Sequence, residues 1–389
     1  MNILFISEDY YPYLSGVPVV VQYLAEGLSK KHKVHVATSV PPNDTNPITE
    51  SINGVSVHRF KIYRNIAKVL KGDIVELQKY VISSNFDVII IECGQASTTD
   101  AVLPVLEQIK APCIIHAHGL SGLLGKPFEL KSDFKHTIGN TYNWVRMQKY
   151  YRYTFKNACR HFAASISLTN SDSGYAYLAK NINENYVLGN AAEDMFFQDE
   201  IETYDWKLYG KPYLISIANF SVVKNQIGMM REFYRTIDKG YSLVMIGSQE
   251  NDYYEKMKAE KERLDQQYGY RSVDILTGIN RLYFPSILDG ASAYIVSSIC
   301  EVFSISIIEA LARGVPFIST AVGNARELPG GLVVDSLEQM HIAIDNLLAD
   351  DLKRKKLGEC GKQYAYDNCR RKTAVDNLEK IIQEVMNLN

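Results

Sequence analysis

The stretch Cys300–Pro316 reads Cys-Glu-Val-Phe-Ser-Ile-Ser-Ile-Ile-Glu-Ala-Leu-Ala-Arg-Gly-Val-Pro and joins a predicted strand to a predicted helix. The apolar run Ala293–Val296 before it has the length of a short buried strand. In the second half of Cys300–Pro316, apolar residues recur at helical spacing up to Gly314, and the final proline opens the next strand. Glu301 is therefore expected at the carboxyl end of a strand, and Glu309 just inside the following helix.

This placement of two acids suits a sugar nucleotide. Free N–H groups and the positive dipole end at a helix start bind phosphate, and a carboxylate can accept hydrogen bonds from both hydroxyls of a sugar diol. The alternative is an exposed capping residue at Glu301 and a solvated helix residue at Glu309. The spacing alone leaves both interpretations open.

The wider segment resembles glycosyltransferase family four, retaining enzymes of the GT-B fold. The family signature is a Glu, seven residues, a second Glu, and a small-residue helix that ends in Gly-x-Pro. Four residues of this chain match it: Glu301, Glu309, Gly314 and Pro316. The family usually has glycines beside the Phe and a proline shortly after, where this chain has Val302, Ser304 and Ser306. Side chains therefore stand where bare backbone is common.

Composition indicates an ordinary globular protein with two domains. The chain has 389 residues, a formal net charge of −2 and 46% hydrophobic residues, enough for two substantial cores. Its six cysteines form no CxxC pair and no metal-like spacing with histidine, which predicts reduced thiols in a cytosolic protein. The chain starts with a strand pattern instead of a signal peptide, and no apolar run approaches the ~20 residues of a membrane span.

The first domain opens like a doubly wound α/β domain. Asn2–Ser7 is a predicted strand, and a loop with Gly16 leads to a helix from about residue 18 to 31. Ligands of such domains bind at the carboxyl ends of the strands, where Gly16 lets backbone approach a phosphate; a plain turn glycine is the alternative. The dinucleotide pattern GxGxxG is absent, which argues against a nicotinamide enzyme.

Two histidines end a later strand of this domain. In the predicted strand Pro112–Gly119, His116 and His118 point to the same face because side-chain direction repeats every two residues. The resemblance implies that His118 contacts the donor sugar, whereas His116 is interpreted as a core histidine. A zinc site here would need further ligands, which the sequence does not identify.

Residues 126–160 have an unusual composition, with eight Lys and Arg against two acids and many interleaved aromatics. On a predicted helix from about Thr141 to Ala158, they suit anionic lipid, a polyprenyl diphosphate or an anionic glycan. A helix with core-facing aromatics and a solvated basic face is the alternative. Nucleic acid is not expected, since no binding motif is recognised and the pI is about 6.5.

The second domain repeats the strand and helix pattern from residue 212 onward. After the strand that ends near Ala218, the family has an Arg, four residues and a Lys, both holding the diphosphate. Here Lys224 keeps its place but Asn219 replaces the Arg. The resemblance also implies that backbone groups at Ile279 and Asn280 contact the nucleobase.

The resemblance implies two Rossmann-like domains facing a central cleft: residues 1–190 on the acceptor side, residues 191–369 binding the nucleotide sugar, and a last helix, 370–389, crossing back. It implies retaining transfer from a UDP- or GDP-linked sugar to a glycan or lipid-linked acceptor in cell-surface polysaccharide synthesis, without metal or other cofactor. Glu309 would hold the ribose, Lys224 and the amides of residues 304–307 the diphosphate, and Glu301 and His118 the sugar.

The expected nucleotide-sugar-binding residues are Gly16, Asn219, Lys224, Ile279, Asn280, Phe303, Ser304, Ile305, Ser306 and Glu309. The cytoplasm, with peripheral contact at the inner face of the cell membrane through residues 126–160, is the expected location. A catalytically silent sugar-nucleotide-binding subunit is the alternative that Asn219 suggests. An epimerase or phosphorylase of the same fold is a further one.

Overall fold

The computed structural model describes residues 1–13, 16–120, 123, 134–204 and 212–388, with the side chains of 134–140 left aside. The chain divides into two compact units, residues 1–189 with 374–389, and residues 190–373. The division falls close to the predicted boundaries at 190 and 370. Within the described ranges, no helix combines the length and the apolarity that a membrane span needs.

The first unit is built on an eight-stranded sheet in the order β10-β9-β8-β7-β1-β2-β4-β3. Its strands are β1 (Asn2–Ser7), β2 (Lys33–Ser39), β3 (Thr49–Ile52), β4 (Val55–Phe60), β7 (Val88–Glu92), β8 (Cys113–Ala117), β9 (Ala164–Ser167) and β10 (Glu184–Val187). All neighbours are parallel except β3 and β4, which pair antiparallel around Asn53 and Gly54. Both turn residues have positive φ, a conformation that an Asn-Gly turn favours.

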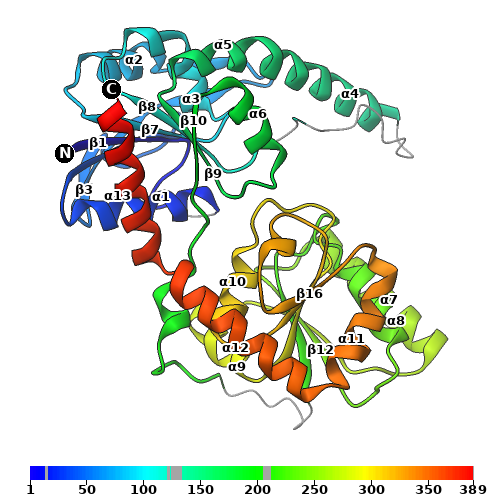
Figure 1. Cartoon of the computed structure of the whole chain (residues 1–389). Coiled ribbons are helices and arrows are strands. Elements are labelled where there is room, and N and C mark those ends of the chain that lie inside the picture. The colour runs from blue at the N-terminus through cyan, green and yellow to red at the C-terminus, as the bar shows by residue number, and fades with distance from the viewer. Residues whose placement is uncertain (14–15, 121–122, 124–133, 205–211, 389) are drawn as a thin grey trace. The chain divides into compact units, whose positions relative to one another are not determined.

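Helices cover this sheet on both faces (Figure 1). On one face, α2 (Ile74–Ser83), α3 (Ser97–Val102) and α6 (Ser173–Asn181) contribute to one apolar core. α1 (Val17–Ser29) lies beside α13 (Arg371–Leu388), since Val375 closely approaches Gly27 and Glu379 bonds His32 at 2.9 Å. The last helix therefore packs on the first unit from residue 374 onward.

The basic aromatic stretch is one continuous helical segment in three parts. It consists of α4 (Phe134–Lys149), a π-helical turn over Tyr150–Phe155, and α5 (Lys156–Ala158). Its end agrees with the prediction, but it begins before residue 141. Tyr151 and Phe155 are buried in the core, whereas Tyr142 and Tyr153 are exposed. The part of the prediction that falls on residues 126–133 lies outside the described residues.

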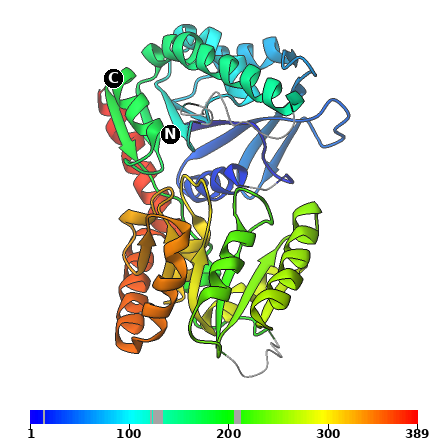
Figure 2. The same cartoon turned by 90° about the vertical axis from the view of Figure 1, so that its right-hand side faces the viewer.

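The second unit has a six-stranded parallel sheet in the order β13-β12-β11-β14-β15-β16 (Figure 2). Its strands are β11 (Tyr213–Ile217), β12 (Ser242–Gly247), β13 (Val273–Thr277), β14 (Ala291–Val296), β15 (Phe317–Thr320) and β16 (Gly331–Val334). One core packs α9 (Phe284–Asp289), α10 (Ile305–Ala312) and α12 (Asp351–Asn368) on one face. The other holds α7 (Gln226–Arg235), α8 (Asp252–Tyr268) and α11 (Met340–Leu348). Both units are therefore doubly wound α/β, as predicted.

Candidate functional site

The strand that precedes α10 and the helix itself lie as the opening stretch predicts. β14 ends at Val296, α10 spans Ile305–Ala312, and Gly314 closes it with a φ of 74°. Glu301 thus lies in the loop at the carboxyl end of a central strand, and Glu309 in the second turn of α10. The first N–H groups of α10 have no acceptor within the helix, so they are available to an anion.

The loop of Glu301 is joined to the loop of Lys224. The Lys224 ammonium forms an ion pair with the Glu301 carboxylate, and Ser298 Oγ donates to the same carboxylate at 2.7 Å. Ser297 Oγ donates to the carbonyls of Lys224 and Asn225 at 2.9 and 3.0 Å. The structure therefore brings together two residues, 77 positions apart in the sequence, that were assigned to the sugar and the diphosphate.

The departures from the family signature are accommodated at the start of α10. Ser304 is buried and precedes the helix, and its hydroxyl lies 3.2 Å from that of Ser306. Phe303 packs half-buried against the core, and Ile305 begins the helix. The two serine side chains therefore bond to each other at this helix start.

Glu309 is nearly buried, with 4% of its side chain exposed, and is held by an arginine. Arg281 donates to its Oε1, while the Arg281 Nε binds Glu193, whose other oxygen lies 3.7 Å from Arg371. Burial raises the pKa of Glu309 to about 7, although the Arg281 charge acts to lower it. Oε2 of Glu309 has no hydrogen-bond partner among the described residues, which leaves it open to a ligand.

The other residues expected at the nucleotide lie at the same sheet edge. Asn219 is exposed after β11, and its carbonyl accepts a hydrogen bond from Gln226 at 3.1 Å. Asn280 uses its side chain to accept from the Leu282 N–H at 3.0 Å, and Ile279 packs against the core. Arg281 is engaged by two carboxylates, so in this structure it does not stand in for the arginine that Asn219 replaces.

In the first unit, His116 and His118 share a carboxylate that sequence reasoning missed. Glu92 ends β7, accepts from His118 Nε2 at 2.6 Å and lies 3.1 Å from His116 Nδ1. Burial favours the neutral form of Glu92, but the imidazoles outweigh it and lower the pKa of Glu92 to about 2. Burial also lowers the pKa of His118, although its hydrogen bond to Glu92 acts to raise it.

The register between neighbouring strands is the feature from which the contact of Glu92 with the histidines could have been predicted. β7 and β8 are neighbours, and Glu92 pairs directly with His116. Ligand atoms of Glu92, His116 and His118 lie within 4.8 Å of one another, so they are a candidate metal-binding set. The direct contacts of 2.6 and 3.1 Å are those of hydrogen bonds, and a metal would have to take the place of their protons.

A cavity of about 370 Å³ lies at the carboxyl ends of β1 and β7. Its lining includes the acids Glu8, Asp9 and Glu92, and also Val17 at the start of α1. Gly16 precedes that helix with a φ of 63°, and a Cβ there would meet no atom within 4 Å. Glycine is therefore favoured at this position by the backbone conformation and not by a lack of space for a side chain.

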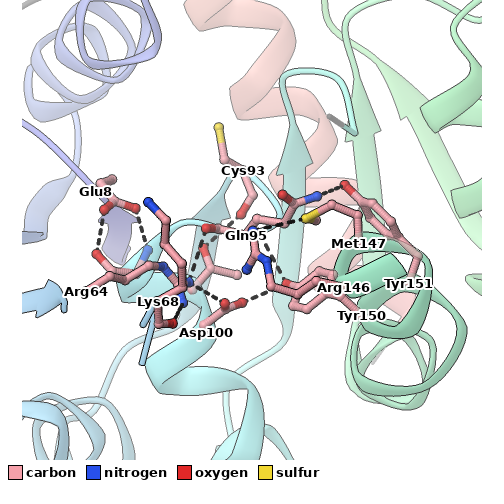
Figure 3. Close-up of polar contacts among 12 residues, drawn as sticks. Glu8, Arg64, Lys68, Cys93, Gln95, Asp100, Arg146, Met147, Tyr150 and Tyr151 are labelled. Atoms are coloured by element: carbon pink, nitrogen blue, oxygen red, sulfur yellow. Dashed lines mark hydrogen bonds and ion pairs between the residues drawn. The ribbon is translucent and has the colours of Figure 1, made fainter. Parts of the chain in front are cut away.

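One wall of this cavity is held in an unusual backbone conformation by tyrosines (Figure 3). Cys93 and Gln95 line the cavity and have φ values of 63° and 70°, which side-chain-bearing residues seldom adopt. Tyr150 accepts from the Gln95 N–H at 3.1 Å and donates to Asp100 at 2.7 Å, and Tyr151 bonds the Gln95 amide. The π-helical turn supplies both tyrosines.

Comparison with known proteins supports the resemblance found in the sequence. Residues 201–364 match the family described as "Glycosyl transferases group 1". A trehalose synthase of Rubrobacter xylanophilus is 24% identical over 176 residues, 41% of this chain and 40% of that protein. The match therefore spans about 40% of the length of this curated relative.

Solved structures show the fold of the whole chain. A sucrose-phosphate synthase from Thermosynechococcus elongatus superposes with a TM-score of 0.72 at 16% identity over 100% of both chains. Anabaena HepE, solved in complex with UDP and glucose, gives a TM-score of 0.68 at 14% identity over 98% of this chain and 99% of that chain. The predicted GT-B fold is confirmed.

Proposed function

We propose that this chain, whose residues 201–364 match the group 1 glycosyl transferases, is a glycosyltransferase that uses a nucleotide diphosphate sugar. The observation that carries this proposal is the start of α10. It offers free helix amides, the Lys224–Glu301 ion pair at the preceding loop, and Glu309 bound to Arg281 within the helix. That HepE was solved with UDP and glucose supports a nucleotide-sugar donor. Nucleotide release from UDP- and GDP-sugars, with and without acceptor extract, tests the proposal.

Donor binding in this proposal rearranges one ion pair. A diphosphate at the amide groups of α10 attracts the Lys224 ammonium, which is 32% exposed and can turn away from Glu301. Glu301, still held by Ser298, is then free to accept from a hydroxyl of the sugar. Glu309 accepts from the ribose hydroxyls, and His118 of the first unit orients the sugar.

The transfer proceeds with retention of configuration. The acceptor oxygen attacks the anomeric carbon on the face of the leaving group, the bond to the phosphate oxygen breaks, and that oxygen takes the acceptor's proton. Lys224 and the dipole of α10 offset the charge that develops on the diphosphate. No side chain is assigned as a nucleophile.

The acceptor in this proposal is a glycan or a lipid-linked sugar, as in cell-surface polysaccharide synthesis on the cytoplasmic side of a membrane. Lys149 and Arg152, both exposed on the basic helical segment, support an acceptor that carries phosphate. A catalytically silent subunit is the second candidate, because Asn219 removes one bidentate clamp. Nucleotide binding without release under every acceptor condition would favour the silent subunit. Conversion of the donor into another nucleotide sugar fits an epimerase, and phosphate-dependent formation of a sugar phosphate from a glycan fits a phosphorylase.

Chelation should leave activity intact. Excess EDTA is expected to change the rate of nucleotide release less than twofold, because Lys224 and the helix amides offset the diphosphate charge. Complete loss that added Mn²⁺ or Mg²⁺ restores would overturn this mechanism. Glu92→Gln would then show whether the metal lies at Glu92, His116 and His118.

Donor affinity should rise with pH through about 7, because the ionised Glu309 accepts more strongly than the acid. UDP-glucose and GDP-mannose are suitable probes, since a doubly esterified diphosphate does not titrate near this pH. Arg281→Met should move the midpoint upward by about 1–3 pH units. Calorimetry at pH 5.5–9 measures the donor affinity of wild type and of Arg281→Met, and Arg326→Met, at an exposed arginine, is the matched control. Parallel curves for all three proteins would contradict the assignment.

A further inference from the structure

A small hairpin outside the main sheet of the first unit presents apolar side chains to solvent. Among the described strands, β5 (Ile62–Arg64) and β6 (Leu70–Gly72) pair only with each other. In the turn between them Ile66 is fully exposed, more than any other large apolar side chain described, and Val69 is 50% exposed. Tyr63 on β5 is 40% exposed. Sequence reasoning missed this hairpin, because three-residue strands show too little periodicity.

The hairpin is also strongly basic. Residues 61–72 include Lys61, Arg64, Lys68 and Lys71, and no acid. The three lysines are exposed. Tyr63 pairs opposite Lys71 in the register, so these two side chains project from the same face of the hairpin. An aromatic and a cationic side chain therefore share one face of this exposed hairpin.

Three hydrogen bonds close the turn of the hairpin. Asn65 donates its N–H to the Val69 carbonyl at 3.0 Å, and its side chain accepts from the Val69 N–H at 2.9 Å. Lys68 donates to the Asn65 carbonyl at 2.8 Å. Ile66 is therefore exposed on a hydrogen-bonded turn. Such a turn loses little conformational entropy when it binds a surface.

The inner face of the hairpin is anchored to the body of the unit. Arg64 forms an ion pair with Asp100 and donates to the Gln95 carbonyl at 3.3 Å and the Lys68 carbonyl at 3.4 Å (Figure 3). Gln95 lines the cavity at the ends of β1 and β7. Arg64 of the hairpin therefore contacts a residue of the cavity wall.

The basic helical segment adjoins the hairpin. Arg64 and Leu70 line a cavity of about 470 Å³ together with Tyr150, Thr154 and Asn157. Near this cavity the segment exposes Tyr153, and Arg152 and Lys156 are exposed beside it. Two basic elements with exposed aromatic or aliphatic side chains therefore neighbour each other.

We propose that the hairpin 61–72 docks on an anionic lipid surface, with Ile66 and Val69 among the headgroups and Lys61, Lys68 and Lys71 against lipid phosphates. Apolar side chains flanked by lysines suit a membrane interface, where each lysine stem lies along the acyl boundary and its ammonium reaches phosphate. A protein partner fits less well, because lysine is depleted at protein interfaces. The proposal gives the lipid-linked acceptor of the proposed function a membrane contact, but its geometry is independent of that function.

Vesicle sedimentation of the full chain tests this docking. With vesicles of equal phosphatidylglycerol and phosphatidylcholine at 50 mM salt, wild type is expected to bind and to dissociate at 500 mM salt. Each lysine near such a surface is worth about fivefold in partitioning, so Lys68→Glu with Lys71→Glu should lower binding at least 25-fold. Ile66→Ser with Val69→Ser should lower it at least tenfold.

Matched controls come from the second unit. Lys355→Glu with Lys356→Glu on α12, and Ile237→Ser at an 83% exposed site, should bind vesicles like wild type. All replaced side chains are exposed, so melting temperatures should agree, and Lys68→Gln with Lys71→Gln provides a milder variant of the same test. The latter should still lower binding about 25-fold, because both charges are removed.

Three results would overturn the proposal. They are no binding of wild type at 50 mM salt, full binding of both hairpin double variants, or loss of binding only when Lys149, Arg152 and Lys156 are changed to Glu. The last would assign membrane contact to the helical segment instead. UDP and GDP affinities, measured on the same variants, should stay at the wild-type value. A chain that binds vesicles but no nucleotide would sink the proposed function and leave the docking surface standing.

Discussion

Glu309→Ala should weaken binding of UDP or GDP, whichever the wild type binds, by at least a hundredfold at pH 8. A carboxylate that accepts two ribose hydroxyls contributes about 1.5–3 kcal/mol per charge-assisted bond, and both bonds are lost. Oε1 is held by Arg281, so the carboxylate is already oriented before the nucleotide arrives. Isothermal titration calorimetry measures the change.

The controls separate this role from a structural one. Glu359→Ala, an exposed change on α12, should leave the affinity unaltered. A 2′,3′-dideoxy nucleotide should bind wild type and Glu309→Ala equally, because it lacks the hydroxyls in question. Unchanged affinity for UDP and GDP in a folded Glu309→Ala protein would show that the ribose assignment is wrong.

Glu309 should also make folding stability depend on pH in the opposite sense to affinity. Its folded-state pKa of about 7 lies above the usual 4.5, so the folded protein binds the proton more tightly than the unfolded chain. The stability that Glu309 contributes is present below about pH 4.5 and is lost as pH rises through about 7. The melting temperature of wild type should therefore fall relative to Glu309→Gln between pH 5 and 8.

His118→Ala should lower kcat by about 10²–10³-fold and change nucleotide affinity less than threefold. The proposed contact is to the sugar and strengthens as the anomeric bond breaks, so it acts on the transition state more than on the bound donor. The Glu92 carboxylate, buried and ionised, fixes the His118 ring through a 2.6 Å bond. Glu92→Gln should therefore lower kcat in the same direction with a smaller loss.

His116→Ala serves as the comparison within the same cluster. His116 is fully buried, and its ring lies tilted against that of His118 with centroids 4.1 Å apart, so its loss should lower the melting temperature through a cavity. Melting temperature and kcat are measured for each variant. Near wild-type kcat in His118→Ala, together with loss of kcat in a folded His116→Ala, would show that the roles of the two histidines are exchanged.

Most elements could be predicted from local pattern, and the errors have local causes. β1 agrees with the predicted strand Asn2–Ser7 at both ends because it is a short apolar run with polar residues at its ends. α3 begins at Ser97, where the distant Glu8 carboxylate binds the Ser97 N–H and hydroxyl, a contact that local pattern does not reveal. A 3₁₀-helix with Pro104 near its start follows in place of further α-helix.

The candidate site could be predicted only as a set of separate residues. The sequence pointed to Lys224, Glu301, Glu309 and His118, and each lies at the carboxyl end of a parallel strand or on the helix that follows. Their partners could not be read in the same way. Arg281 stands 28 positions before Glu309, and Glu92 stands 26 positions before His118.

The sequence by itself determined the alternation of strands and helices, the two-unit α/β architecture and the residues that reach the strand ends, because periodicity and turn residues act over a few positions. Only the tertiary structure decided which charges meet. Lys224 reaches Glu301 because β11 and β14 are neighbours in the sheet, and Glu92 reaches both histidines because β7 pairs with β8. Strand order and register set these pairings, and they depend on how whole faces pack together, which no single segment encodes.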